Sequence, residues 1–141
     1  MKILHKECIL TNSMMNLIIT KYLIKLFPFY KFVWAHADYE SNLDIILQVV
    51  KKGYWVGFDT IRVGTYEARK QLIEYAVANN YINQVMLSED NDFYEEGNKA
   101  DGVERYCAFF NTFMPFCIEN GLPQDLMESL ITDNPARFYD F

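Results

Sequence analysis

The stretch FVWAH at residues 32–36 is a short apolar run that ends in a histidine, His36. Two similar runs follow it, KGYWVGFD at residues 52–59 and VMLSED at residues 85–90, and they end in Asp59 and Asp90. Short apolar runs bounded by polar residues predict buried strands. Ionisable residues at the carboxyl ends of successive strands are typical of (β/α) barrels, whose catalytic side chains lie at that edge. Imidazole and carboxylate are also the usual non-sulfur ligands of zinc, so His36 and Asp90 are candidate metal ligands.

The segments between these strands predict helices. After Ser41-Asn42, a plausible N-cap, apolar residues recur at helical spacing until Gly53 ends the segment. Thr65 predicts the start of a second helix over residues 66–78, and we expect its buried face to consist of Ala68, Leu72, Tyr75 and Ala76. Crossovers of this length predict parallel strands with right-handed connections. A doubly wound sheet fits the same order, but no glycine-rich phosphate loop follows a strand, which disfavours its nucleotide-binding versions.

The flanking regions predict shorter elements. We expect a strand at residues 8–11, a helix over 14–26, a polar loop over 91–102 and a helix over 103–111. A further helix begins at Pro115 and is closed by Gly121, another covers residues 123–130, and a last turn opens at Asn134. Aromatic residues in strands or at helical spacing are interpreted as core: Trp34, Trp55, Tyr106, Phe109, Phe110 and Phe113.

Composition limits the classes of partner. The chain has 141 residues and a net charge of −6, with acids and bases interspersed, which argues against non-specific nucleic-acid binding. Its three cysteines are far apart, which fits reduced thiols in the cytoplasm better than a disulfide framework. The apolar region over residues 14–29 is short and contains Lys21 and Lys25, so we expect no membrane span.

Several of these motifs resemble the phosphotriesterase family of the amidohydrolase superfamily, which includes the phosphotriesterase-like lactonases. Residues 34–38, 52–59 and 81–90 resemble its sixth, seventh and eighth strand units. Met114-Pro115-Phe116, Glu119-Asn120-Gly121 and residues 134–138 resemble its C-terminal helices. The resemblance implies an α/β fold that is the C-terminal part, about strands 5–8, of a TIM-type (β/α)8 barrel. Residues 1–141 would then form one partial barrel domain, in which residues 29–141 match the family and residues 1–28 are unassigned.

The resemblance also implies a function. Members of this family use two divalent ions, usually zinc, that share a hydroxide, and they hydrolyse lactones or phosphoric and carboxylic esters. By this match His36 would bind one metal ion and Asp90 the other, and Asp90 would also take the proton from the hydroxide. Two metal ions lower the pKa of bound water and polarise the bond to be broken.

The chain departs from the family pattern in several places. The first four strand units, with the paired histidines of the first strand and the carbamylated lysine, have no counterpart here. Asn12 stands where a fifth-strand histidine is expected, so no ligand is assigned to Asn12 or His5. Thr60 stands where many relatives have arginine or histidine. A complete barrel also takes about 250 residues, so we interpret the chain as part of one.

Three hypotheses for the function therefore remain. The chain is part of a hydrolase completed by another chain or by self-association, a catalytically inactive fragment, or an interaction module that uses an open sheet edge.

Individual residues also have plainer interpretations. His36 could be a buried histidine bonded to a carbonyl, and Asp90 a loop carboxylate. Asp59 is interpreted as a structural or orienting acid, and Asp38 as a partner of His36 or a helix cap. Arg62 is a surface residue or a substrate contact.

Overall fold

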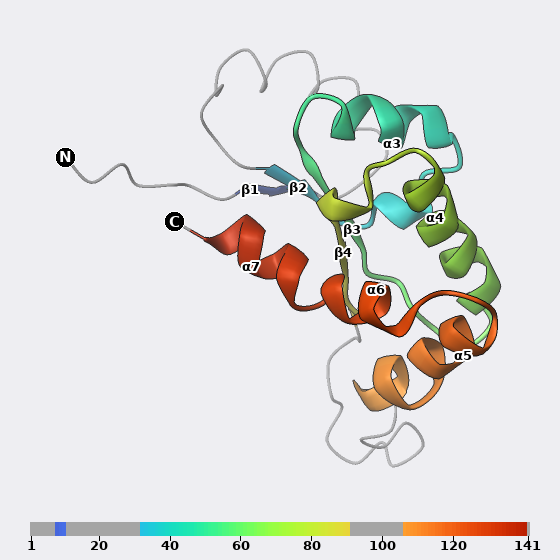
Figure 1. The fold of residues 1–141 in the computed structure, drawn as a ribbon. Helices are drawn as coiled ribbons and strands as arrows, with labels where there is room; N and C mark the ends of the chain where they lie inside the picture. Colours follow the sequence, from blue (N-terminus) through green and yellow to red (C-terminus); the bar gives the residue numbers. More distant parts are fainter. Residues whose placement is uncertain (1–7, 11–31, 91–105, 141) are drawn as a thin grey trace, which may run out of the picture.

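A computed structural model describes residues 8–10, 32–90 and 106–140 of the chain. Its centre is a four-stranded sheet in the order β1-β2-β3-β4, and all neighbouring strands are parallel. The strands are β1 (Cys8–Leu10), β2 (Phe32–Trp34), β3 (Trp55–Phe58) and β4 (Val85–Leu87). Helices flank this sheet (Figure 1). The predicted parallel α/β arrangement is therefore confirmed. The expected helix over 14–26 and loop over 91–102 lie outside the described residues.

The strand register brings the carboxyl ends together. Trp34 is paired with Val56, and Phe58 is paired with Leu87. The residues that follow these strands, His36, Asp59 and Asp90, therefore emerge at one edge of the sheet. Parallel strands joined by helical crossovers produce this alignment because each strand runs in the same direction.

One helix lies in the crossover from β2 to β3 and another in the crossover from β3 to β4. After a 3-10 turn η3 (Ala37–Tyr39), α3 spans Leu43–Val50, and the Asn42 side chain caps it by accepting the Asp44 N–H at 3.1 Å. Gly53 then adopts a φ of +86°, as expected of a glycine that ends a helical segment. The second crossover contains α4 (Tyr66–Ala78), whose bounds match the prediction.

The predicted buried face of α4 was partly wrong. Leu72 and Ala76 are buried and Tyr75 is half-buried, but Ala68 is exposed, and Ile73 and Lys70 are buried instead. Lysine can bury its aliphatic stem while its amino group keeps a polar partner, and the Lys70 amino group lies 2.7 Å from the Glu74 carboxylate. Because its side chain is small, an alanine such as Ala68 is a weak indicator of which face of a helix is buried against the core.

The C-terminal region differs from the two separate helices that we expected around Pro115. A π-helix, η6 (Phe109–Phe113), runs directly into α5 (Met114–Glu119). Pro115 has no N–H to donate to the preceding turn and its ring crowds that turn, and a wider π turn before it relieves both problems. Gly121, at φ +96°, then ends α5 as predicted. The last helices are α6 (Gln124–Ser129) and α7 (Asp133–Tyr139). No helix among the described residues is long and apolar enough to cross a membrane.

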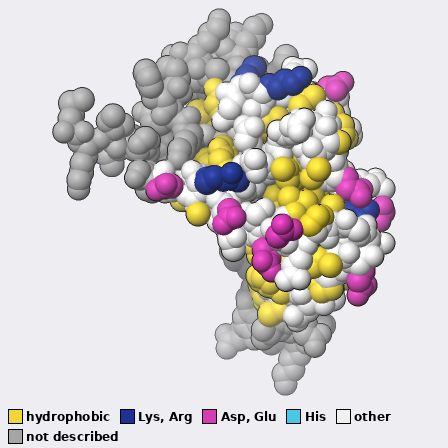
Figure 2. Space-filling model, in the orientation of Figure 1, with side chains coloured by type: hydrophobic (Ala, Val, Ile, Leu, Met, Phe, Trp, Pro, Cys, Tyr) yellow, Lys and Arg dark blue, Asp and Glu magenta, His cyan; other side chains and the backbone are white. Residues whose placement is uncertain are grey.

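The core contains most, but not all, of the aromatic residues assigned to it. Trp34, Phe109 and Phe113 are buried, and half-buried Trp55 packs edge-on against Phe138 at 5.5 Å between ring centroids. The other two members of the aromatic series are exposed at the surface, Phe110 at 60% and Tyr106 at 39%. Figure 2 shows hydrophobic side chains grouped near the centre of one face, with charged side chains around them.

Asn134 connects α7 to the amino-terminal end of β4. Its buried amide donates hydrogen bonds to the carbonyl oxygens of Val85 at 2.5 Å and Ile82 at 2.9 Å. Its own oxygen accepts a hydrogen bond from Arg137. The side chain thus bonds α7 to the backbone at the start of β4, where the Ile82 carbonyl also accepts the Val85 N–H.

Replacing Asn134 by alanine is expected to lower the free energy of unfolding by about 1–3 kcal/mol, because the hydrogen bonds from its buried amide to the Val85 and Ile82 carbonyls are lost. Urea denaturation measures this loss. Asn120→Ala is the matched control, since Asn120 donates a similar bond to Phe116 from an exposed position. It should cost less than about 0.5 kcal/mol. Equal losses in the two variants would show that the Asn134 contacts do not hold α7 to β4.

A second prediction concerns Cys117, which is a free thiol in the core beside Lys70 and Glu74. Burial raises the pKa of this thiol to about 12, against a smaller lowering by Lys70. Because the thiolate is the nucleophile, only about one thiol in ten thousand would be reactive at pH 8. Iodoacetamide should therefore leave Cys117 unmodified in the folded chain and modify it fully in urea, as measured by peptide mass spectrometry. Rapid modification of the folded chain would contradict this packing.

Candidate metal-binding site at the carboxyl end of the sheet

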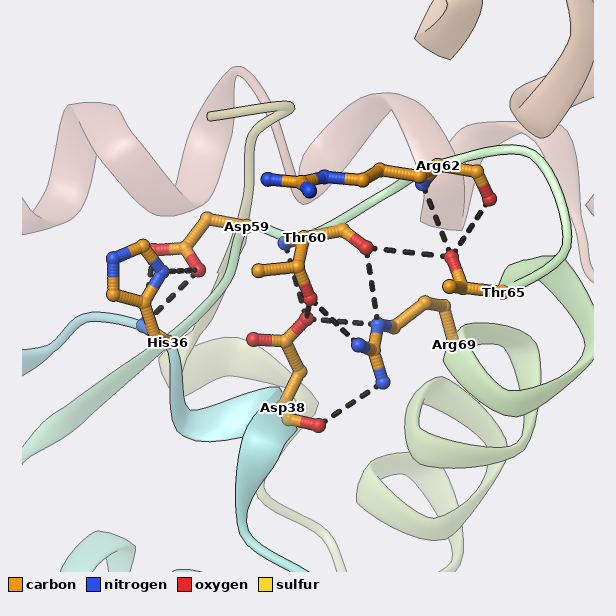
Figure 3. A network of polar contacts seen from close by, with 7 residues as sticks. All are labelled: His36, Asp38, Asp59, Thr60, Arg62, Thr65 and Arg69. Atoms are coloured by element: carbon orange, nitrogen blue, oxygen red, sulfur yellow. Dashed lines mark hydrogen bonds and ion pairs between the residues drawn. The ribbon is translucent and has the colours of Figure 1, made fainter. Parts of the chain in front are cut away.

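His36 follows β2 at the carboxyl edge of the sheet and is only partly buried. Its backbone is in the left-handed region, with φ 57° and ψ 30°. This conformation is uncommon for a residue with a side chain and costs about 1–3 kcal/mol, so it persists where surrounding contacts enforce it. The contacts that enforce it come from Asp59 (Figure 3).

Asp59 holds both the backbone and the ring of His36. Its carboxylate accepts the His36 backbone N–H, with both oxygens at 3.0 Å, and lies 2.7 Å from His36 Nδ1. An ionised carboxylate only accepts hydrogen bonds, so Nδ1 is the donor. In the neutral imidazole the other ring nitrogen, Nε2, then carries the free lone pair that a metal-binding imidazole requires. The sequence interpretation of Asp59 as an orienting acid is confirmed in this sense.

Two features of the environment of Asp59 shift the pKa of its carboxyl in opposite directions. Burial at the end of β3 raises the pKa of the Asp59 carboxyl above its ordinary value. The hydrogen bonds from the His36 backbone and ring oppose this effect, because they stabilise the ionised form.

Asp90 lies on the other side of the His36 ring. One of its carboxylate oxygens, Oδ2, is 3.6 Å from His36 Nε2, and its side chain is 53% exposed. Asp90 also has a positive φ, 42°, and the third such non-glycine residue among those described is Asn80. The structure therefore brings His36 and Asp90 together at the carboxyl edge, and it gives both an unusual backbone conformation.

Gly57 leaves room for the Asp59 carboxylate at the site. A Cβ atom at this position would lie 3.3 Å from Asp59 Oδ2 and 3.5 Å from the Ala35 Cα. A larger residue would therefore press on the carboxylate that holds His36. The sequence alone did not single out Gly57, because its importance depends on where the Asp59 side chain turns in the fold.

A buried polar network lies behind the site. The Asp38 carboxylate accepts the Thr60 backbone N–H at 3.0 Å and the Thr60 hydroxyl, and it forms an ion pair with Arg69 Nε at 2.8 Å. Asp38 thus pairs with Thr60 and Arg69, and not with His36 as one interpretation held. Its second oxygen, Oδ1, is buried without a hydrogen-bond partner among the described residues. Arg69 lies 31 residues from Asp38, so no local motif indicated this pair.

Arg62 lies at the surface of the loop between β3 and α4. The Thr65 hydroxyl accepts the Arg62 backbone N–H at 3.0 Å and also lies 2.8 Å from its carbonyl oxygen. Thr65 therefore braces this loop, and its side chain makes no hydrogen bond to the first turn of α4. Arg62 is exposed, which fits its interpretation as a surface residue and leaves its guanidinium accessible to ligands.

The donor types present fit a zinc ion, but the described residues do not complete a site. Zinc–nitrogen and zinc–oxygen bonds of about 2.0–2.2 Å put two ligands of a tetrahedral ion about 3.4 Å apart. The 3.6 Å between His36 Nε2 and Asp90 Oδ2 is close to that value, so the pair suits a single shared ion as well as two neighbouring ions. Within residues 8–10, 32–90 and 106–140, no group of three or more His, Cys, Asp or Glu is placed to hold a metal.

Comparisons with known proteins point to one family. The sequence model of the phosphotriesterase family matches residues 27–139. The chain is 32% identical over 108 residues to the phosphotriesterase homology protein of Escherichia coli strain K12. This alignment covers 74% of this chain and 37% of that protein.

Solved structures agree. The crystal structure of the E. coli phosphotriesterase homology protein, complexed with phosphate in its active site, matches with a TM-score of 0.78 and 27% identity. That match covers 95% of this chain and 47% of the other. The phosphotriesterase of Mycobacterium tuberculosis matches in fold, with a TM-score of 0.63 and 17% identity, over 77% of this chain and 36% of that one.

The chain thus spans less than half the length of each of these relatives. The family model nevertheless covers four-fifths of its residues, including β2, β3, β4 and the three residues at their carboxyl ends. This chain belongs to the phosphotriesterase family.

Proposed function

We propose that the chain is the C-terminal part of a (β/α)8-barrel hydrolase and contributes His36 and Asp90 to its divalent-metal centre. Family membership supports a metal-dependent hydrolase as the class. The observation that carries the assignment is the 3.6 Å approach of His36 Nε2 to Asp90 Oδ2 at the carboxyl edge of a parallel sheet. Barrel enzymes present their catalytic residues at this edge.

The substrates would be lactones or phosphoric and carboxylic esters. When bound, divalent zinc lowers the pKa of a water molecule and polarises the bond to be broken. His36 would hold the metal through Nε2, with its ring oriented by Asp59. Asp90 would bind the metal through one oxygen, and its half-exposed carboxylate could accept the proton of the attacking water.

The remaining ligands have to come from outside the described residues. Zinc sites in proteins use three or four protein ligands, and His36 and Asp90 supply two. Other parts of this polypeptide, a second copy of it, or a complementing chain that supplies the other barrel strands would provide the rest. In the relatives compared above, more than half of the protein lies beyond the matched region.

A second candidate function is an interaction module without catalysis. It is favoured by the donor count, since the described residues hold no group of three potential ligands. In that case β1–β4 would serve as a docking half of a barrel, and the His36–Asp59–Asp90 arrangement would be structural.

Zinc binding separates the two candidates. Equilibrium dialysis of the purified chain should show bound zinc, and His36→Ala or Asp90→Asn should weaken binding by more than about a hundredfold. This expectation follows because even the hydrogen-bond partners of ligands contribute about 10- to 100-fold to metal affinity. Asp44→Asn, which makes the same change as Asp90→Asn at an exposed carboxylate of α3, is the matched control and should bind as the wild type does.

Turnover is measured on the same samples with a γ-lactone and a chromogenic phosphotriester. Zinc-dependent hydrolysis that is lost in His36→Ala would support the hydrolase. A folded chain that binds no zinc, or binds it equally well without His36 and Asp90, would contradict a metal centre that forms without a complementing chain and would favour the interaction module.

A further inference from the structure

Arg69 joins the two loops that carry the candidate site. Its guanidinium uses all three nitrogens: Nε lies 2.8 Å from Asp38 Oδ2, Nη1 donates to the Asp38 carbonyl at 3.0 Å, and Nη2 donates to the Thr60 hydroxyl at 2.6 Å. Arg69 lies one turn into α4, behind the carboxyl edge of the sheet (Figure 3). One side chain on a rigid helix therefore contacts two separate loops.

The residues that Arg69 contacts lie next to the candidate site in the sequence. Asp38 is two residues after His36, and Thr60 directly follows Asp59. The Thr60 N–H also donates to Asp38 at 3.0 Å, so the two loops are bonded to each other as well as to Arg69. Any movement of one loop relative to the other changes the separation of His36 and Asp59, which are held by contacts of 2.7 and 3.0 Å.

The contacts of Arg69 with Asp38 and Thr60 are largely buried. The Asp38 side chain is fully buried and that of Arg69 is 11% exposed. A buried ion pair is weak evidence for stability, because desolvation offsets much of the attraction. What a planar, multiply bonded guanidinium does provide is fixed geometry, which a lysine with one charged nitrogen cannot reproduce.

Tyr39 extends the same link to the imidazole. The Arg69 guanidinium carbon lies 6.0 Å from the centre of the Tyr39 ring, within range of a cation–π contact. The Tyr39 ring in turn lies 6.1 Å from the His36 ring. Arg69 thus contacts the His36 loop through two of its side chains, Asp38 and Tyr39.

From this geometry we infer that Arg69 is the positioning residue of the site: it sets the spacing of the His36 and Asp59 loops and so the direction of His36 Nε2. Arg69 touches neither His36 nor Asp59 in any contact described above, so it acts through Asp38 and Thr60. The positioning itself is independent of metal, and only its consequence for zinc rests on the proposed function.

The test uses Arg69→Lys, which keeps the charge but not the three bonds, and Thr60→Val, which removes only the hydroxyl and preserves the side-chain shape. The first readout needs no metal: the NMR shift and hydrogen exchange of the His36 backbone N–H, which donates to the Asp59 carboxylate. Both variants are expected to move this signal toward the unbonded range and to speed its exchange. The second readout is zinc affinity, expected to fall about 10- to 100-fold.

Two controls separate positioning from general stability. Arg62→Lys makes the same exchange at an exposed arginine of the neighbouring loop and should leave the His36 signal unchanged. Asn134→Ala weakens the opposite end of the sheet, and it should lower stability while also leaving the His36 signal unchanged.

The outcomes are distinguishable. A shifted His36 signal in Arg69→Lys and Thr60→Val, with neither control affected, supports the positioning role even if the wild-type chain binds no zinc. Absence of zinc binding by the wild-type chain would count against the proposed function and not against the positioning role of Arg69. If both variants lose stability but keep the wild-type His36 signal, Arg69 is a structural residue only and the inference is overturned.

Discussion

The Asp59 carboxylate is the group on which the candidate site depends. It receives both the backbone N–H and the ring of His36, at 3.0 and 2.7 Å. The backbone bond fixes a left-handed residue directly after β2, and the ring bond selects the nitrogen that faces Asp90. Loss of this carboxylate would remove the 2.7 Å contact with Nδ1 that sets the direction of the His36 ring. The position of this carboxylate depends on the absence of a side chain at Gly57, where a Cβ atom would lie 3.3 Å from Asp59 Oδ2.

Strand topology explains why three distant residues meet. β2, β3 and β4 are consecutive both in the sequence and in the sheet, and all are parallel. Their carboxyl ends therefore share one edge, and His36, Asp59 and Asp90 emerge from it in that order. The contact between the outer two, His36 and Asp90, passes across the end of the middle strand. The strained φ values of His36 and Asp90 turn their side chains at the point where each chain leaves the sheet.

The sequence predicted the parts of the fold that local patterns determine. The positions of α3, α4 and the strands follow from helical spacing and apolar runs. The sequential order of the strands in the sheet was implied by the family resemblance. The proximity of His36 and Asp90 followed from their places at strand ends. The exposure of Ala68 and the π-helix before Pro115 were missed, because the first depends on how α4 rolls against its neighbours and the second on a backbone bond that proline removes. The Asp38–Arg69 pair was also missed, since it joins segments that only the tertiary fold brings together.

The central claim, that Asp59 orients His36 with Nε2 free for a ligand, is tested most directly by the ¹⁵N NMR spectrum of the His36 imidazole. The measurement is made on the metal-free chain, at a pH at which the imidazole is neutral, with His5 replaced by glutamine so that a single imidazole is observed. The account predicts a protonated Nδ1, with its proton protected from exchange, and an unprotonated Nε2. A ring protonated at Nε2, or one that interconverts freely between the two forms, would contradict it.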